Sequence, residues 1–283
     1  MTGSNDSHTG YGGIDMEEPF QRGGEQDGRL AGQVVVVTGA GGGVGRATAG
    51  RLGREGALVA LIARGGPGVS TAAVEVGAAG GSGIVYEADA ADYEQVRTAA
   101  ERIETDLGPI DVWINVTDAA PGARFTDMPP EEFRRSAEAA FLSGAWGTRV
   151  ALDLMRPRGR GTIVQAVSAL AYRAVPGRSA YCAAEHAIRG MTESIRSELR
   201  ETGDQLKITM VRLPAPEAGP LKPRGHGQQA DALVFAACHP ERAEYRADTL
   251  ISGRWPSRHP ALTAALLGVG TGAAIAALRR RLT

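Results

Sequence analysis

The stretch TGAGGGVG, residues 38 to 45, directly follows the apolar run VVVV at 34 to 37 and precedes a segment rich in Ala, Arg and Leu. This order predicts a strand, a tight glycine turn and then a helix. Glycines let the backbone turn sharply and approach a pyrophosphate, and the free N–H groups of a helix N-terminus favour negative charge. A flexible linker is the alternative, because the chain holds 39 glycines. The position between strand and helix favours a nucleotide-binding turn.

Length, charge and cysteine content limit the classes of protein to which this chain can belong. Its 283 residues, 43% of them hydrophobic, are enough for a single large α/β domain with tails. The formal net charge of -1 argues against a nucleic-acid surface, so we expect small-molecule partners. Cys182 and Cys238 match no metal-ligand spacing. We interpret both as reduced thiols of a cytoplasmic protein and expect no metal site.

Apolar runs alternate with helical patterns along the middle of the chain. Predicted strands cover residues 34–37, 57–63, 84–88, 111–115, 162–167 and 207–211. Predicted helices cover residues 93–107, about 130–155 and about 180–201. Because each strand is apolar throughout, the pattern predicts a doubly wound parallel sheet covered by helices on both faces. This is a three-layer α/β/α fold of the Rossmann type, whose ligands bind at the carboxyl ends of the strands.

Tails of different character flank this predicted nucleotide-binding domain, which we assign to residues 31–253. Residues 1–30 have little periodic hydrophobicity, and we expect them to be disordered. Residues 254–283 form a C-terminal tail with an apolar helix, in which residues 261–278 carry no charge. We favour a helix packed on the domain or on a partner subunit. The alternative is peripheral or tail-anchored membrane association through residues 261–281.

Further residues have the order and spacing of a known family. Asp89 lies in EADAAD, Asn115 ends an apolar run, and Ser168 and Tyr181 are thirteen residues apart. Together with the glycine turn, they resemble the short-chain dehydrogenase/reductase (SDR) family over roughly residues 30 to 253. The resemblance implies hydride transfer between a nicotinamide cofactor and a carbonyl or alcohol substrate, in a homo-oligomer. It also implies Tyr181 as the proton donor and Ser168 as the residue that anchors the substrate oxygen.

The resemblance further implies which residues bind the cofactor. They lie in the glycine turn and at the ends of predicted strands: Thr38, Gly39, Gly43, Val44, Gly45, Arg64, Asp89 and Asn115. Ala63 and Arg64 stand where an acidic residue would bind the ribose 2′-hydroxyl of NAD. A guanidinium can instead bind a 2′-phosphate through charged hydrogen bonds, so we predict NADP over NAD. An ordinary solvated loop arginine is the alternative for Arg64.

The catalytic pattern departs from the family at several positions. The segment YCAAE places Glu185 where the resemblance implies a lysine, on the same helix face as Tyr181. A carboxylate there raises the pKa of the tyrosine, whereas a lysine lowers it. Ala140 stands where the resemblance implies an assisting asparagine, and Thr117 lies in an altered NNAG motif. Two hypotheses follow: an NADP-dependent oxidoreductase, or a non-catalytic NADP-binding protein that acts as a sensor or partner subunit.

Single residues of this pattern also have simpler interpretations. Glu185 can form a surface ion pair with Arg189, four residues further along the helix. Tyr181 can be a packed tyrosine and Ser168 a hydroxyl at a strand end. His186 follows Glu185 and points about 100° away around the helix, so we expect no catalytic role for it.

Overall fold

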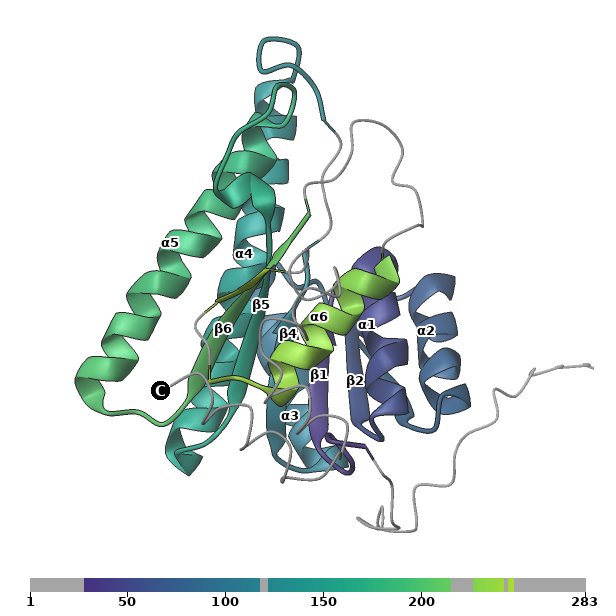
Figure 1. The fold of residues 1–283 in the computed structure, drawn as a ribbon. Helices are drawn as coiled ribbons and strands as arrows, with labels where there is room; N and C mark the ends of the chain where they lie inside the picture. The colour runs from purple at the N-terminus through teal and green to yellow at the C-terminus, as the bar shows by residue number, and fades with distance from the viewer. Residues whose placement is uncertain (1–27, 118–121, 215–225, 242–243, 247–283) are drawn as a thin grey trace, which may run out of the picture.

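A computed structural model describes residues 28–117, 122–214, 226–241 and 244–246 of the protein (Figure 1). Its strands form one seven-stranded sheet in the order β3-β2-β1-β4-β5-β6-β7, and neighbouring strands are parallel. The strands are β1 Val34–Thr38, β2 Leu58–Ala63, β3 Ser82–Glu87, β4 Ile110–Asn115, β5 Thr162–Ser168, β6 Lys207–Leu213 and β7 Glu244–Arg246. The predicted doubly wound parallel sheet is confirmed.

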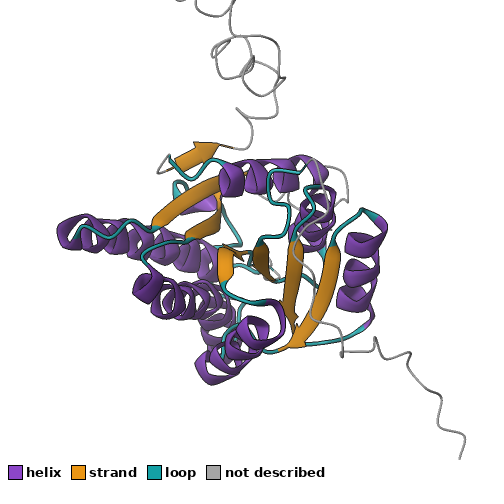
Figure 2. Cartoon of the chain, turned by 90° about the horizontal axis from the view of Figure 1, so that it is seen from below, coloured by secondary structure: helices purple, strands orange, loops and turns teal. Residues whose placement is uncertain are grey.

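Helices cover both faces of this sheet (Figure 2). They are α1 Gly43–Arg54, α2 Pro67–Ala78, α3 Tyr93–Leu107, α4 Pro130–Met155, α5 Ser179–Thr202 and α6 His226–Cys238, with short 3-10 helices η1 Arg156–Arg158 and η2 Ala169–Ala171. Helix α1 packs against α2 and α6, whereas α4 packs against α3 and α5. The three-layer arrangement therefore has one helix group on each face.

Most predicted elements are present, and the differences have local causes. All of the predicted strands and helices occur, and α3 ends before Gly108, whose φ of 94° suits glycine. No helix is predicted from the sequence at α2 or α6, and no strand is predicted at β7, which has only 3 residues. Residues 1–27 and 261–278 lie outside the described residues. Within the described part, no helix is long and apolar enough to cross a membrane.

The four valines of β1 show why the strands are apolar throughout. Val35 and Val37 belong to the core cluster on one face of the sheet, and Val34 and Val36 belong to the cluster on the other. All are 0% exposed. Since successive strand residues point to opposite faces, a sheet covered on both sides buries every one of them. Each buried side chain of this size contributes about 1.5 to 3 kcal/mol.

The strand order creates a crevice at the carboxyl ends of β1 and β4. The chain adds β2 and β3 on one side of β1 and then crosses over to place β4 on the other side. Helices after β1 and β4 therefore run to opposite faces, and the loops above these strands separate. Gly39 follows β1 and Val116 follows β4 at this point. The fold thus places the glycine turn where doubly wound sheets bind their ligands.

Candidate functional site

The glycine turn packs closely against the end of β4. The backbone N–H of Val116 donates to Thr38 Oγ1 at 3.2 Å. Gly39 has a φ of +65°, and a Cβ there would lie 2.3 Å from the Val116 carbonyl oxygen. A Cβ at Gly45 would lie 2.2 Å from the Gly39 carbonyl oxygen. These positions require glycine both for the turn and for the contact between the start of α1 and β1.

The N-terminus of α1 is open to an anionic ligand. The helix starts at Gly43, and its N-cap, Gly42, makes no side-chain capping hydrogen bond. The first turn contains no acidic residue, and Val44 packs into the core beneath it. The first N–H groups of a helix have no partner within the helix, and its dipole favours negative charge there. The turn can therefore hold a phosphate group through its backbone.

A cavity of about 640 Å³ lies beside this turn. Its walls include Gly39, the end of β2 at Ala63 and Arg64, the β3–α3 loop with Asp89, and residues of α4. The volume is in the range of small-molecule sites. Arg64 is exposed and has no ion-pair or hydrogen-bond partner among the described residues. Its guanidinium is thus available to a ligand in the cavity, and the residues present fit a nucleotide with an additional phosphate.

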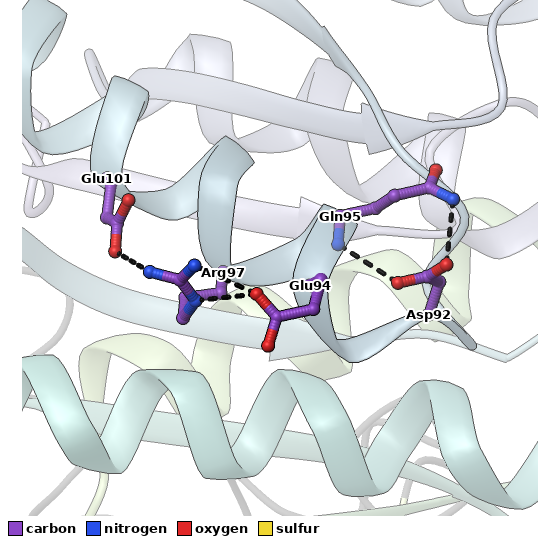
Figure 3. A network of polar contacts seen from close by, with 5 residues as sticks. All are labelled: Asp92, Glu94, Gln95, Arg97 and Glu101. Atoms are coloured by element: carbon purple, nitrogen blue, oxygen red, sulfur yellow. Dashed lines mark hydrogen bonds and ion pairs between the residues drawn. The ribbon is translucent and has the colours of Figure 1, made fainter.

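The loop that carries Asp89 is held by the first turn of α3. The Asp89 backbone N–H donates to Gln95 Oε1 at 3.0 Å, and the Ala91 N–H donates to Asp89 Oδ1 at 3.0 Å. Asp92 caps the helix, because its Oδ1 accepts the Gln95 backbone N–H at 3.1 Å and its Oδ2 accepts from Gln95 Nε2 at 2.9 Å (Figure 3). Such a cap contributes about 1 kcal/mol. The cavity wall at Asp89 is therefore anchored to α3.

Asn115 lies in the core beneath the site, away from the cavity wall. Its Nδ2 donates to Gln165 Oε1 at 3.0 Å and to Thr148 Oγ1 at 3.1 Å, and its Oδ1 accepts from Trp113 Nε1 at 2.8 Å. Helix α4 approaches so closely that a Cβ at Gly147 would lie 2.1 Å from Asn115 Oδ1. The side chain links β4, β5 and α4. This placement does not support the expected contact between the Asn115 side chain and the cofactor.

Ser168, Tyr181 and Glu185 meet at the carboxyl ends of β4 and β5. Ser168 ends β5, and Tyr181 and Glu185 lie one turn apart on α5. Glu185 is 0% exposed, and its Oε2 accepts the Ser168 backbone N–H at 2.7 Å. The Thr117 hydroxyl donates to Glu185 Oε1 at 3.4 Å. Ser168 Oγ accepts the Leu170 N–H at 3.1 Å, and the Ser168 hydroxyl also hydrogen-bonds with the Tyr181 hydroxyl.

Burial raises the pKa of both acidic groups of this cluster. Burial raises the pKa of Tyr181 well above its usual range, and the adjacent charge of Glu185 raises it further. Hydrogen bonding with Ser168 and Thr117 opposes this shift only in part. Burial also raises the pKa of Glu185, although the Ser168 N–H and the Tyr181 and Thr117 hydroxyls stabilise its ionised form. Tyr181 is therefore neutral at physiological pH.

Ala140 lies at the cavity wall and packs in one cluster with Tyr181 and Leu170. Its methyl group provides no hydrogen bond where the resemblance implies an amide. Thr117 is the site residue whose role the sequence analysis missed. The available signal was a hydroxyl two residues after the end of β4, at the edge of the sheet where the site forms, but nothing in the spacing connects it with Glu185.

The surface ion pair considered for Glu185 is wrong. Glu185 is buried, and Arg189 Nε donates to Glu193 Oε1 at 2.9 Å. His186 is exposed, and its Nδ1 lies 2.8 Å from the Cys182 carbonyl oxygen of the preceding turn. That orientation agrees with the expectation that His186 points away from the site. Glu185 thus belongs to the interior cluster.

Comparisons with known proteins agree with this arrangement. The family model described as short chain dehydrogenase matches residues 33–220. An uncharacterized oxidoreductase, YxnA of Bacillus subtilis, is 28% identical over 235 residues, which are 77% of this chain and 66% of that protein. The probable oxidoreductase EphD of Mycobacterium tuberculosis is 34% identical over 171 residues, 60% of this chain and 29% of that protein. The chain thus spans less than two thirds of the length of either relative.

A solved structure extends the likeness to three dimensions. The crystal structure of a metagenomic short-chain oxidoreductase in complex with NADP has a TM-score of 0.66 and 26% sequence identity. The match covers 77% of this chain and 96% of that one. The family match includes the glycine turn, Ser168 and Tyr181. On its sequence and its fold, the chain belongs to the short-chain dehydrogenase family.

Proposed function

We propose that the protein is an NADP(H)-dependent oxidoreductase that transfers a hydride between the nicotinamide and a carbonyl or alcohol carbon. The observation that carries the proposal is the meeting of Ser168 and Tyr181 at the strand ends, next to Thr117, which also lines the cavity beside the glycine turn. Arg64 on the cavity wall favours NADP, and the structural relative solved with NADP supports this choice. The cofactor supplies or accepts the hydride when bound, and the residues of the chain position the substrate and handle its proton.

Each residue has a role that follows from its contacts. The glycine turn and the N-terminus of α1 hold the pyrophosphate, and Arg64 binds the 2′-phosphate. In the proposed reaction the Ser168 hydroxyl, which lies beside the Tyr181 hydroxyl, donates to the substrate oxygen. Tyr181 is only 6% exposed, so its hydroxyl is largely shielded from water. It holds the proton that the substrate oxygen gains in reduction.

NADPH titration by calorimetry, followed by a panel of carbonyls and alcohols, tests this function. We expect binding, and turnover that Tyr181→Phe reduces by about 10² to 10⁴-fold. Tyr172→Phe is the matched control, because the Tyr172 ring packs against the guanidinium groups of Arg189 and Arg212, at 4.3 and 4.6 Å, and belongs to a different packing cluster from Tyr181. Full turnover by Tyr181→Phe would show that the proposed acid is wrong.

A second candidate is a non-catalytic NADP-binding protein that acts as a sensor or as a partner subunit. Ala140, which offers no amide, and the carboxyl group of Glu185 beside Tyr181 favour it. Tight NADPH binding without turnover of any substrate in the panel would support this candidate over the first.

A further inference from the structure

We propose that Glu185 is the proton-holding partner of Tyr181, so that the two residues pass a proton between the substrate oxygen and the Glu185 carboxyl group. In alcohol oxidation, the substrate O–H bond breaks and its proton binds the Tyr181 oxygen, while the Tyr181 proton moves to Glu185. Carbonyl reduction uses the same path in reverse. The proposal rests on the proposed function, in which NADP(H) is the oxidant or reductant that accepts or supplies the hydride.

The contacts of Glu185 suit a group that gains and loses a proton in place. The carboxyl group receives the Ser168 backbone N–H at 2.7 Å and the Thr117 hydroxyl at 3.4 Å, on different oxygens. These donors come from the ends of β5 and β4, which the sheet holds in register. Both can persist when the carboxyl group is protonated, because each oxygen keeps a lone pair for its donor. The change of charge therefore requires no rearrangement of the backbone.

A path without a tyrosinate follows from the same geometry. A tyrosine that simply gave up its proton would leave a second negative charge one helical turn from a buried carboxylate, where like charges repel strongly. If Tyr181 passes on a proton as it receives one, it stays neutral throughout. The net transfer is then between the substrate oxygen and Glu185. A lysine at the same position would instead place a positive charge beside Tyr181 and favour the tyrosinate.

The direction of the reaction then depends on the ionisation of Glu185. Oxidation requires the ionised carboxylate, and reduction requires the protonated acid. The titratable groups that act on the carboxyl group are Tyr181 and His186, both on α5. Ser168, Thr117 and Ala140, which meet the cluster from β5, the end of β4 and α4, carry no charge. The pH dependence of the two directions is therefore expected to report mainly on Glu185.

Glu185→Gln tests the relay, because the amide keeps the size and the acceptor for the Ser168 N–H but cannot take up a proton. In the wild type, we expect reduction to fall and oxidation to rise across one pH range. In Glu185→Gln, we expect both rates to fall by about 10²-fold and this opposing pH dependence to disappear. Glu185→Asp should retain the opposing pH dependence. Glu193→Gln, an exposed glutamate on the same helix that pairs with Arg189, is the control and should behave as the wild type.

A second measurement needs neither cofactor nor turnover. The ultraviolet absorbance of ionised tyrosine is followed with rising pH in the wild type, Glu185→Gln and Tyr181→Phe. Removing the charge of Glu185 should move the ionisation of Tyr181 to lower pH, so that Glu185→Gln shows additional absorbance that the other two proteins lack. A folded Glu185→Gln variant with an unchanged tyrosine titration would overturn the relay. So would a Glu185→Gln variant whose activity depends on pH in the same way as that of the wild type. If NADPH binds but the wild type never turns over, the proposed function fails, and this titration alone decides whether the two groups are coupled.

Discussion

Replacing Arg64 with alanine is the most direct test of the cofactor preference. Arg64 lies on the cavity wall next to Ala63, and no carboxylate among the described residues pairs with it. A 2′-phosphate bound there would form charge-assisted hydrogen bonds with the guanidinium group. NADH has no such phosphate. Arg64→Ala should therefore weaken NADPH binding and leave NADH binding nearly unchanged.

The size of the effect follows from the exposure of the arginine. Hydrogen bonds to charged groups contribute about 1.5 to 3 kcal/mol, which corresponds to about 10 to 150-fold in the dissociation constant. Because the Arg64 side chain is exposed, water and salt screen the interaction, and we expect about tenfold at physiological ionic strength. Calorimetric titrations of both cofactors, repeated at low and high salt, measure this. The preference of the wild type for NADPH should decrease as salt increases.

The control for Arg64→Ala is Arg97→Ala on the surface of α3. The exposed Arg97 guanidinium donates to Glu94 at 2.8 Å and to Glu101 at 2.5 Å (Figure 3). It carries the same charge but does not line the cavity. If both variants weaken NADPH binding equally, the effect is one of net charge. Equal affinity of the wild type for NADPH and NADH would refute the reasoning outright.

Four further substitutions test the packing in and beneath the site. Gly39→Ala should lower the free energy of unfolding in urea by about 1 to 2 kcal/mol for its positive φ alone, and by more because of the contact with β4. Gly42→Ala, whose Cβ would meet nothing within 4 Å, should be nearly neutral in the same assay. Asn115→Ala should cost about 1 to 3 kcal/mol by leaving the Trp113 N–H unpaired, while NADPH affinity measured by calorimetry stays close to that of the wild type. Glu185 has a raised pKa, so its contribution to stability is present below its ordinary value of 4.5 and is lost as pH rises through the raised value. Urea unfolding over a pH series should therefore show that the free energy of unfolding of Glu185→Gln increases relative to that of the wild type as pH rises. A difference between the two proteins that stays constant with pH would contradict the raised pKa of Glu185.

The fold could be predicted from sequence because its determinants are local and repeated. Apolar runs, helical spacing and glycine stops each act over a few residues, and together they predict the alternation of strands and helices. The turn at Gly39 was predictable for the same reason, since a strand, glycines and a helix follow one another directly. Helix α6 escaped prediction because its burial depends on packing against α1, which is distant in sequence.

The site was predictable only as far as its residues follow a spacing. Ser168 and Tyr181 were found by their separation, and Arg64 by its place after β2. The contacts of Asn115 and Thr117 were not predictable, because they depend on which way a side chain at a strand end turns. In the structure Asn115 turns into the core toward α4, whereas the Thr117 hydroxyl turns toward α5. The spacing in the sequence specifies which residues lie at a strand end, but it does not specify which neighbouring helix their side chains contact.

Glu185 shows how one substitution changes the chemistry of its neighbours. An ammonium group at this position would face the Ser168 backbone N–H, donor against donor, and would have to turn away from the end of β5. The carboxyl group instead accepts that N–H at 2.7 Å and a hydroxyl from Thr117 at 3.4 Å. These contacts would be lost together if the carboxyl group were removed, and a buried N–H without an acceptor costs about 1 to 3 kcal/mol. Glu185 is therefore integrated into the packing of the site as well as placed beside its tyrosine, and restoring a lysine there would require the surrounding donors to change with it.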